Sequence, residues 1–387
     1  MRLSRGGCQG DAARGGPRAV GTWEQDASTL ALGTPQFLGE TPSGAEKPIL
    51  TGIPPARPDT YWGLTTQCCR PRSRLWPKLD RAGLPGRLLA ALAGALILVW
   101  GRRKCTAAVV ASDMTGNAFA LLQSLLPPGR VPAVMIDCLW YLPRNRLSRW
   151  LKGLQLRLEA RSVYRFVVWS KHEVQDYARA FGIAEEKLLF VPFHTTLMGY
   201  SYSVSTGNYV FAGGNGDRDY ATLARAVRGL GVPVRVATSN LAAFRGEPIP
   251  PNMRVQACGH AEFRRLMAGA AIVVVPMEAG HLHSGGQQTY LNAMAMGKPV
   301  IVCDPRGPQG YIEDGKNGIL LDYGDSEGLR RAILTLLSQP DLAAAMGRTA
   351  WARIESGSYS TEACMRAVAA LALEGAAAAT GASGANR

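Results

Sequence analysis

Two glycine-containing stretches of this chain have residue types that could hold a phosphate. In the first, "GGNGDR", Gly213 and Gly214 follow an apolar run and Arg218 comes just before a helical pattern. Paired glycines leave backbone N–H groups accessible and a helix N-terminus attracts anions, so the stretch could cradle a phosphate with Arg218 as the cation. A tight turn with a solvent-facing arginine accounts for the same residues equally well. The stretch fits neither the GxGxxG dinucleotide fingerprint nor the Walker A sequence.

The second stretch, "HSGGQQTYLNAMAMGKPVIVCD", joins a polar loop to a helix of small residues and then to an apolar strand pattern. Its glycines let the chain approach a ligand closely, and polar side chains in a first helical turn can hydrogen-bond to that ligand. The amides of that turn point toward any anion in the site. The candidate ligand-binding residues are Ser284, Gly285, Gly286, Gln287, Gln288, Thr289 and Asn292.

Further polar residues follow apolar runs in the N-terminal half. Asp137 ends "VPAVMID" and could orient or deprotonate a hydroxyl group, although an Asp in this position is at least as often a turn or a helix cap. Asp113 and Asn117 follow an earlier run, and we expect them to face the same cleft. Ser170 and Lys171 follow "RFVVW" and should point the same way. Lys171 could meet a phosphate, or it is a solvated residue of a first helical turn.

The histidines and cysteines form no metal-binding pattern. His281 and His283 are two residues apart without a third ligand nearby, and the eight cysteines include no CxxC pair. We therefore expect no metal site, no cofactor, and reduced thiols in a cytosolic protein.

Length and periodicity predict two α/β domains. The chain has 387 residues, of which 47% are hydrophobic and 19% charged, as in globular proteins. Strand and helix patterns alternate from about residue 104 and restart near 208, which is typical of two doubly wound, Rossmann-like domains. The predicted divisions are a flexible basic arm at 1–47, a first domain at 48–200, a second domain at 206–374 and a flexible tail at 375–387.

The charge favours an anionic partner, since the formal net charge is +14. The apolar run 88–100 is flanked by Arg87 and by "GRRK", and its 13 residues fall short of the roughly 20 that span a bilayer. A core-facing helix and an interfacial anchor both explain it. The N-terminus lacks the apolar region of a secretory signal. We expect a cytoplasmic protein, peripheral at the inner face of the membrane, where anionic lipids attract its basic half. No nucleic-acid-binding motif accompanies the charge, so we expect no nucleic-acid partner.

Three segments are recognisable together: "YVFAGGNGDRDYATLARAV", "VVVPMEAGHLHSGGQQTYLNAMAMGKPVIVCD" and "GYIEDGKNGILLDYGDSEGLRRAILTLL". In order and spacing they resemble the donor-binding domain of group 1 glycosyltransferases, family 4, which have the GT-B fold. The resemblance is strongest over residues 206–355 and weaker over 104–200. It implies a retaining, hexosyltransferase-like and metal-independent enzyme with a cleft between two Rossmann-like domains. Such an enzyme moves a sugar from a nucleotide-sugar co-substrate to a hydroxyl of a glycan or lipid-linked acceptor.

The resemblance also implies roles for the candidate residues. Breaking a sugar–diphosphate bond builds negative charge on the leaving group, which amides, a helix N-terminus and a cation must neutralise if no metal does so. By similarity Gly213 and Gly214 lie near the diphosphate, while Arg218 and Asp137 are the catalytic candidates. The glycines and polar residues from Ser284 to Thr289 would bind the donor, together with Asn292.

Two positions depart from the family pattern. Members usually carry Glu-x7-Glu across this loop and helix, and here the two positions are Ser284 and Asn292. Asn292 can still hydrogen-bond a ribose hydroxyl but brings no charge. The departures leave open a non-catalytic, nucleotide-sugar-binding homologue as the alternative. A nucleotide-sugar epimerase would need acid/base carboxylates that the sequence does not clearly place.

Overall fold

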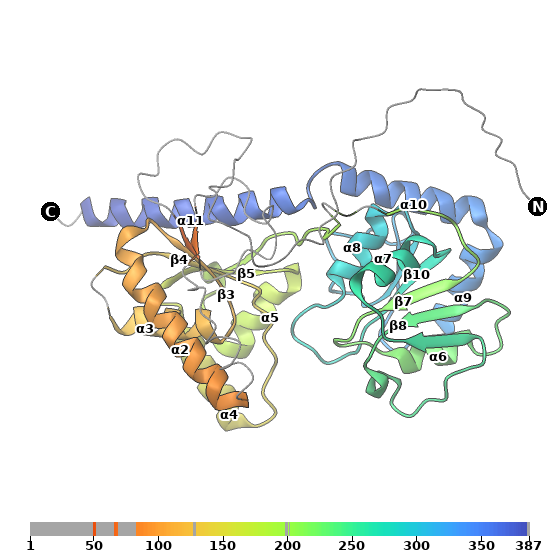
Figure 1. The fold of residues 1–387 in the computed structure, drawn as a ribbon, viewed down its shortest axis with the longest axis horizontal. Helices are drawn as coiled ribbons and strands as arrows, with labels where there is room; N and C mark the ends of the chain where they lie inside the picture. Colours follow the sequence, from red (N-terminus) through yellow and green to blue (C-terminus); the bar gives the residue numbers. More distant parts are fainter. Residues whose placement is uncertain are drawn as a thin grey trace, which may run out of the picture. The chain divides into compact units, whose positions relative to one another are not determined.

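The computed structural model describes residues 49–51, 66–68, 83–126, 129–197, 200 and 202–384. They form two six-stranded sheets whose strand pairs are all parallel, with helices packed on their faces (Figure 1). This arrangement confirms the predicted α/β class. The predicted arm at 1–47 lies outside the described residues.

The first sheet has the strand order β2-β1-β3-β4-β5-β6. Its strands are β1 (Ile49–Thr51), β2 (Thr66–Cys68), β3 (Ala108–Ala111), β4 (Ala133–Ile136), β5 (Val163–Val168) and β6 (Leu188–Phe190). The accompanying helices are α2 (Gly83–Gly101), α3 (Met114–Leu125), α4 (Arg146–Glu159) and α5 (Lys171–Phe181). Side chains alternate between the faces of β3, so Val110 packs beneath these helices with Phe119, while Val109 packs on the opposite face.

Capping residues determine where the helices beside the first sheet begin and end. Asp113 caps α3 by accepting a hydrogen bond from the Gly116 amide at 2.8 Å. Helix α5 begins with a capping box between Ser170 and Glu173, and ends at Gly182, whose φ of 66° is left-handed. Glycine adopts this conformation without a Cβ penalty, which explains why the helix ends here.

The second sheet has the strand order β12-β11-β10-β7-β8-β9. Its strands are β7 (Val210–Gly213), β8 (Val234–Ala237), β9 (Met253–Gln256), β10 (Ile272–Pro276), β11 (Val300–Cys303) and β12 (Ile319–Leu320). Its helices are α6 (Tyr220–Val227), α7 (His260–Ala268), α8 (Gln287–Ala295), α9 (Ser326–Ser338) and α10 (Pro340–Glu355). The strand order changes direction between β7 and β10, so ligands are expected beside the loops that follow these two strands.

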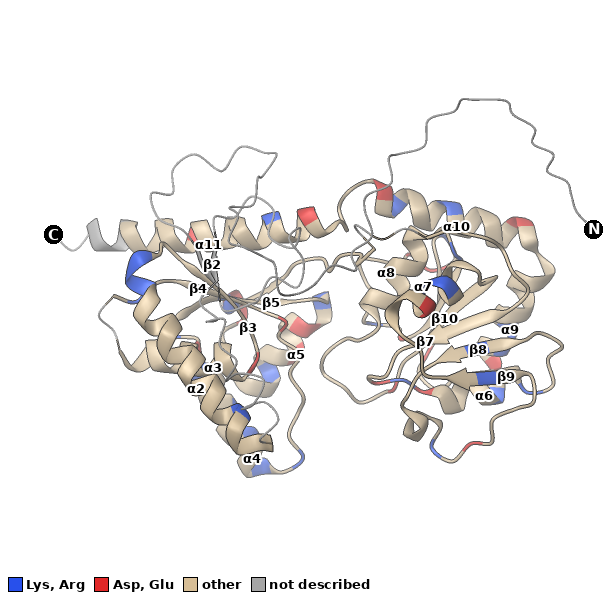
Figure 2. Cartoon of the chain, viewed as in Figure 1, with Lys and Arg blue, Asp and Glu red and all other residues tan. Residues whose placement is uncertain are grey.

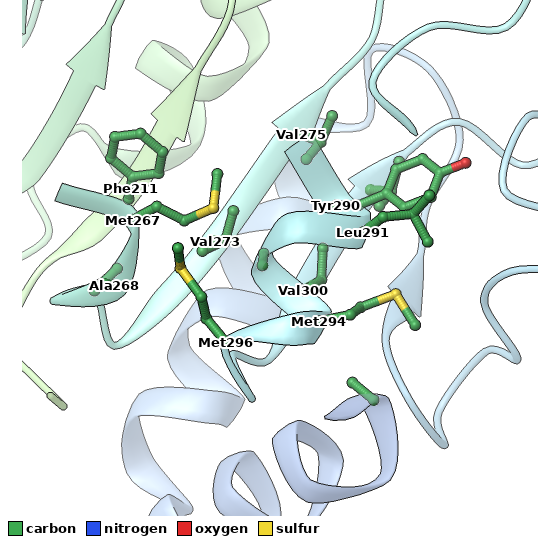
Figure 3. Packing of buried hydrophobic residues seen from close by; sticks show 14 of the residues in the cluster. Phe211, Met267, Ala268, Val273, Val275, Tyr290, Leu291, Met294, Met296 and Val300 are labelled. Carbon is green, nitrogen blue, oxygen red and sulfur yellow. The ribbon is translucent and has the colours of Figure 1, made fainter. Parts of the chain in front are cut away.

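The small residues of α8 bring this helix close to the second sheet. Figure 3 shows Tyr290, Leu291 and Met294 of α8 among the valines of β10 and β11. Ala293 is fully buried in the same cluster. This dense packing holds the N-terminus of α8 at a fixed place above the carboxyl end of β10.

The last helix, α11 (Thr361–Gly384), packs on the first sheet and not on the second. Figure 1 shows it along the face opposite α2 and α3. Cys364, Val368 and Ala372 repeat at every fourth residue and pack against β3, β4 and β5. The sequence-based division assigned residues up to 374 to the second domain and predicted a flexible tail from 375. The structure differs, since α11 packs on the first sheet and continues to Gly384. Alanine-rich sequence has high helix propensity, and an apolar stripe at this spacing gives the helix a face to bury.

Helix α5 connects the two sheets through its N-terminal turn. Glu173 Oε1 accepts a hydrogen bond from the Ser284 amide, and Ser170 Oγ donates one to the Gly307 carbonyl at 3.1 Å. Glu173 Oε2 accepts from the amides of Trp169 and Ser170, both at 2.9 Å. Burial raises the pKa of Glu173 to about 8, while the three amide donors act in the opposite direction. A buried carboxyl thus joins α5 to the loop before α8.

The packing of α11 predicts a position-specific effect of charge. Ala372 is fully buried against the first sheet, whereas Ala370 of the same helix is exposed. Ala372→Asp should lower the free energy of unfolding by roughly 3 kcal/mol or more, because it buries an unpaired charge. Ala370→Asp should change it by less than about 0.5 kcal/mol. Urea unfolding measures both, and equal effects would contradict the observed docking of α11.

The raised pKa of Glu173 predicts a pH-dependent stability. The pKa of this carboxyl is 4.5 in the unfolded chain and about 8 in the folded protein. Between these two pH values the folded protein binds more protons at Glu173 than the unfolded chain does. The contribution of Glu173 is therefore complete at low pH and is lost as the pH rises toward its folded-state pKa. Relative to the wild type, Glu173→Gln should gain roughly 3 kcal/mol in free energy of unfolding between about pH 5 and pH 8.

The matched control for this titration is Glu262→Gln, since Arg265 lowers the pKa of the Glu262 carboxyl. Its difference from the wild type should stay flat over the same pH range. A flat difference for Glu173→Gln as well would mean that the buried carboxylate is ionised throughout.

Candidate active site

A cavity of about 680 Å³ lies at the carboxyl ends of strands from both sheets. The first sheet contributes residues that follow β4, β5 and β6, and the second contributes the loops after β7 and β10, at the change in strand order. Of the residues predicted to bind the donor or to act in catalysis, all except Gly213 line it. Those that line it are Asp137, Gly214, Arg218, Ser284, Gly285, Gly286, Gln287, Gln288, Thr289 and Asn292.

Arg218 is buried at the wall of this cavity, with only 6% of its surface exposed. Its guanidinium donates to the carbonyls of Gly213 at 3.2 Å and Gly216 at 2.8 Å. It also contacts Met277 Sδ at 3.0 Å and Thr289 Oγ1 at 3.3 Å. The alternative of a solvent-facing arginine in a tight turn is therefore wrong.

The partners of Arg218 are neutral, so they orient the guanidinium without cancelling its charge. Burial lowers the pKa of Arg218, against the opposite effects of Tyr220 and Asp217. A buried cation is costly unless an anion compensates it. The arrangement therefore suits a ligand that brings negative charge next to Arg218 and the first turn of α8.

The two glycines before Arg218 serve different purposes. Gly214 has a φ of 118°, and a Cβ there would lie 2.8 Å from Arg218 Nη2. A Cβ on Gly213 would lie 2.4 Å from the ring of Phe263. Gly213 thus allows α7 to pack against β7, while Gly214 leaves room for the guanidinium.

The loop before α8 presents buried polar atoms to the cavity. Gly286 adopts a left-handed φ of 84°, and α8 starts at the next residue. Among the described residues, no partner hydrogen-bonds Ser284 Oγ, Gln287 Nε2 or His283 Nδ1, although all three atoms are buried. Buried polar groups are nearly always paired, so a bound polar ligand would account for these three.

Asn292 and Gln288 are engaged by the connection between the sheets. Asn292 Oδ1 accepts from the Thr196 amide and its Nδ2 donates to Thr196 Oγ1, both at 2.9 Å. Gln288 Nε2 donates to the same hydroxyl at 2.9 Å. Asparagine offers both an acceptor and a donor to Thr196, which explains this residue type at the position where the family usually has Glu.

Sequence reasoning missed an acid–imidazole pair in the cavity. His283 Nε2 lies 2.9 Å from Asp217 Oδ2, and Tyr141 donates to the same oxygen at 3.4 Å. The hydrogen bond from His283 is the main cause of the lowered pKa of Asp217, aided by the charges of His283, His281 and Arg218. Asp217 directly precedes Arg218 in sequence, which could have drawn attention to it. Its pairing with His283, 66 residues away, carries no local signal.

Asp137 lies where the sequence placed it, at the end of β4 in the cavity wall. It has a left-handed φ of 55°, and its Oδ1 accepts from Trp169 Nε1 at 3.1 Å. Burial raises the pKa of Asp137, the Trp169 bond lowers it, and the charge of Asp113 raises it. A carboxyl group in this environment can accept a proton from a ligand hydroxyl.

The remaining polar candidates do not line the cavity. Asp113 is the cap of α3, and Asn117 Oδ1 accepts from Ser112 Oγ at 3.4 Å. Ser170 is the cap of α5, and Lys171 is exposed. The expectation that Asp113 and Asn117 face the cleft is therefore wrong, and for Lys171 the alternative of a solvated first-turn residue is the one observed. In the part of the chain that the structure describes, no three His, Cys, Asp or Glu residues are grouped as metal ligands.

Comparison with known proteins finds a family match within the second half of the chain. Residues 236–339 match the family model of the group 1 glycosyl transferases. The lipopolysaccharide core biosynthesis glycosyltransferase LpsE of Rhizobium meliloti is 37% identical over 73 residues, which are 19% of this chain and 21% of LpsE. The match thus spans about a fifth of that relative's length.

Solved structures show the fold over most of the chain. Sucrose-phosphate synthase from Thermosynechococcus elongatus has a TM-score of 0.59 at 15% identity and covers 80% of this chain and 81% of its own. HepE of Anabaena, in complex with UDP and glucose, has a TM-score of 0.59 at 16% identity and covers 79% and 85%. The chain therefore has the GT-B fold, and its residues 236–339 are similar to the group 1 glycosyl transferases.

Proposed function

We propose that the protein transfers a sugar from a nucleotide-sugar donor to a hydroxyl group of a glycan or lipid-linked acceptor in the cytoplasm. The observation that carries the proposal is Arg218, a buried cation with neutral partners at the wall of the cavity. A donor diphosphate would supply the missing negative charge. The match of residues 236–339 to group 1 glycosyltransferases and the HepE complex with UDP and glucose support this choice of ligand.

The geometry suggests how the residues would act on such a donor. As the bond between the sugar and the diphosphate breaks, charge builds on the leaving phosphate, and Arg218 and the first-turn amides of α8 would stabilise it. Because Arg218 and the first-turn amides of α8 could stabilise this charge without a metal, we propose a metal-independent reaction. We also propose that the reaction retains the configuration at the anomeric carbon. Asp137 is the proposed acceptor of the proton from the attacking hydroxyl group.

A binding protein without turnover is the second candidate. It is favoured by Asn292, whose amide is already engaged by Thr196 and adds no negative charge at the usual position of a glutamate. Both candidates predict donor binding, but only the transferase predicts a glycosylated product. Mass spectrometry of acceptor mixtures after incubation with the donor therefore separates them.

The donor site can be tested by thermal stabilisation against UDP-, GDP-, ADP- and TDP-sugars. A donor at a hundred times its Kd stabilises the folded state by about 2.7 kcal/mol, which raises the Tm by roughly 5–10 °C for a domain of this size. Arg218→Ala should abolish the rise because the diphosphate loses its cation. Arg228→Ala, an exposed arginine outside the cavity wall, should leave it unchanged. No rise with any donor would overturn the proposal.

Gly214 offers a second test of the same site. Gly214→Ala should strain the backbone and displace Arg218, so the donor-dependent rise in Tm should be lost. The control is Gly229→Ala, since Gly229 also has a positive φ, 74°, but a Cβ there meets nothing within 4 Å. Both variants should lose about 1–2 kcal/mol of stability from backbone strain. A full donor response in Gly214→Ala would contradict the assigned role of Arg218.

A further inference from the structure

Helix α2 presents a row of large apolar side chains to solvent. Figure 1 shows it on the outer side of α3 in the first half of the structure. Its opposite side, which includes Ala95 and Leu98, is buried, and among the described residues α3 and β1 contact the helix. The helix therefore has two apolar faces, of which one is exposed. The exposed residues, called here the outer stripe, are Leu84 (56% exposed), Leu88 (54%), Leu89 (58%), Leu92 (47%), Leu96 (51%) and Trp100 (84%).

The spacing of the outer stripe makes it continuous. Five of its six members recur at every fourth residue, from Leu84 to Trp100, and therefore lie along one side of the helix. Contiguous exposed apolar surface of this kind marks a site of interaction with a partner or a membrane. In the described part of the chain, α2 and α11 are the two helices long and apolar enough to cross a membrane.

The charge around the outer stripe is almost entirely positive. Residues 83–159, which include α2, α3 and α4, contain ten Lys and Arg and three acidic residues. The acidic residues are Asp113, which caps α3, Asp137, which lies in the cavity wall, and Glu159, which is buried. Figure 2 shows α2 without acidic residues along its length and with basic residues at its ends, where Arg87, Arg103 and Lys104 are exposed.

The first turns of α4 continue this pattern. Leu147, Trp150 and Leu151 are exposed, and exposed Arg146 and Arg149 lie between and beside them. Helix α3 packs against both α2 and α4, so the three helices cover the same face of the first sheet. Apolar side chains among cations are the composition of an interfacial, membrane-bound helix.

We propose that the outer stripe and the first turns of α4 dock on an anionic lipid bilayer, with α2 lying in the plane of the interface. The leucines and Trp100 enter the boundary between headgroups and acyl chains, and the surrounding Lys and Arg side chains meet the lipid phosphates. The proposal is independent of the transferase activity, because none of these residues lines the cavity.

The packing of α2 on α3 favours lying in the interface over spanning the bilayer. A Cβ on Gly94 would lie 3.0 Å from Thr115 Cγ2, so the two helices approach closely. Arg102 Nη2 donates to the Leu126 carbonyl at 2.9 Å just beyond the end of α2. Insertion across the bilayer would strip this contact surface from α3, whereas docking in the plane keeps it.

The charge also argues against a second copy of the chain as the partner. In a two-fold symmetric dimer the same patch meets itself, so the basic residues beside one outer stripe would face those of the other. Like charges directly opposed in an interface are unfavourable. An anionic lipid surface satisfies both the apolar and the cationic parts of the patch.

The test is co-sedimentation of the full chain with phosphatidylcholine vesicles that contain or lack phosphatidylglycerol. The wild type should bind the anionic vesicles at least tenfold more tightly at about 0.1 M salt, since each cation near the surface contributes roughly fivefold. The triple variant Leu88→Ser, Leu92→Ser, Leu96→Ser should lose at least tenfold in affinity. Arg103→Gln with Lys104→Gln should reduce binding to anionic vesicles only.

The control is the double variant Leu241→Ser with Leu334→Ser. It changes two exposed leucines of the second half and should bind as the wild type does.

The proposal would be overturned if the triple variant bound the vesicles as tightly as the wild type. A wild-type dimer that the triple variant converts to a monomer without a change in lipid binding would also overturn it. Resistance of the wild type to alkaline extraction would overturn the in-plane arrangement in favour of a spanning helix. Donor-dependent Tm shifts of the same variants without vesicles report on the proposed transferase site separately.

Discussion

The buried charge of Arg218, whose hydrogen-bond partners are neutral, is the constraint around which the cavity is built. Its guanidinium is buried, yet carbonyls, a thioether and a hydroxyl are its partners. A buried cation costs free energy unless an anion compensates it, so this arrangement favours an anionic ligand. Gly214 must lack a side chain to leave it room, and Thr289 must lie beside it in the first turn of α8. The loop after β7 and the loop after β10 therefore depend on each other through one side chain.

The acidic groups of the cavity are not where the family usually has them. Ser284 and Asn292 are neutral, and the carboxylates that line the cavity are Asp217 and Asp137. Glu173 stands behind the loop and accepts from the Ser284 amide, so it shapes the cavity wall without lining it. In such a site, neutral hydrogen-bonding groups would contact a sugar, while the charged groups would act on the diphosphate and on the acceptor hydroxyl.

Local patterns in the sequence predicted most of the fold, because buried parallel strands are apolar runs and each is followed by an amphipathic helix. Strand β9 escaped prediction since it lies at the sheet edge with Arg254 exposed, and α11 escaped because its alanines resemble a low-complexity tail. The polar residues near Arg218 could be found from spacing alone. The contacts of Glu173 with Ser284 and of Asp217 with His283 could not, since tertiary packing alone brings these residues together.

The proposed membrane surface bears on the kind of acceptor. Strand β4 ends next to Asp137 in the cavity wall, and the chain then runs directly to Asn145, the cap of α4. One short connection thus joins the proposed proton acceptor to the helix whose first turns carry Leu147 and Trp150. A bilayer against α2 and α4 would hold the cavity within reach of headgroups at its surface. A hydroxyl group carried on a lipid would then arrive already confined to two dimensions, which favours a lipid-linked acceptor over a free glycan.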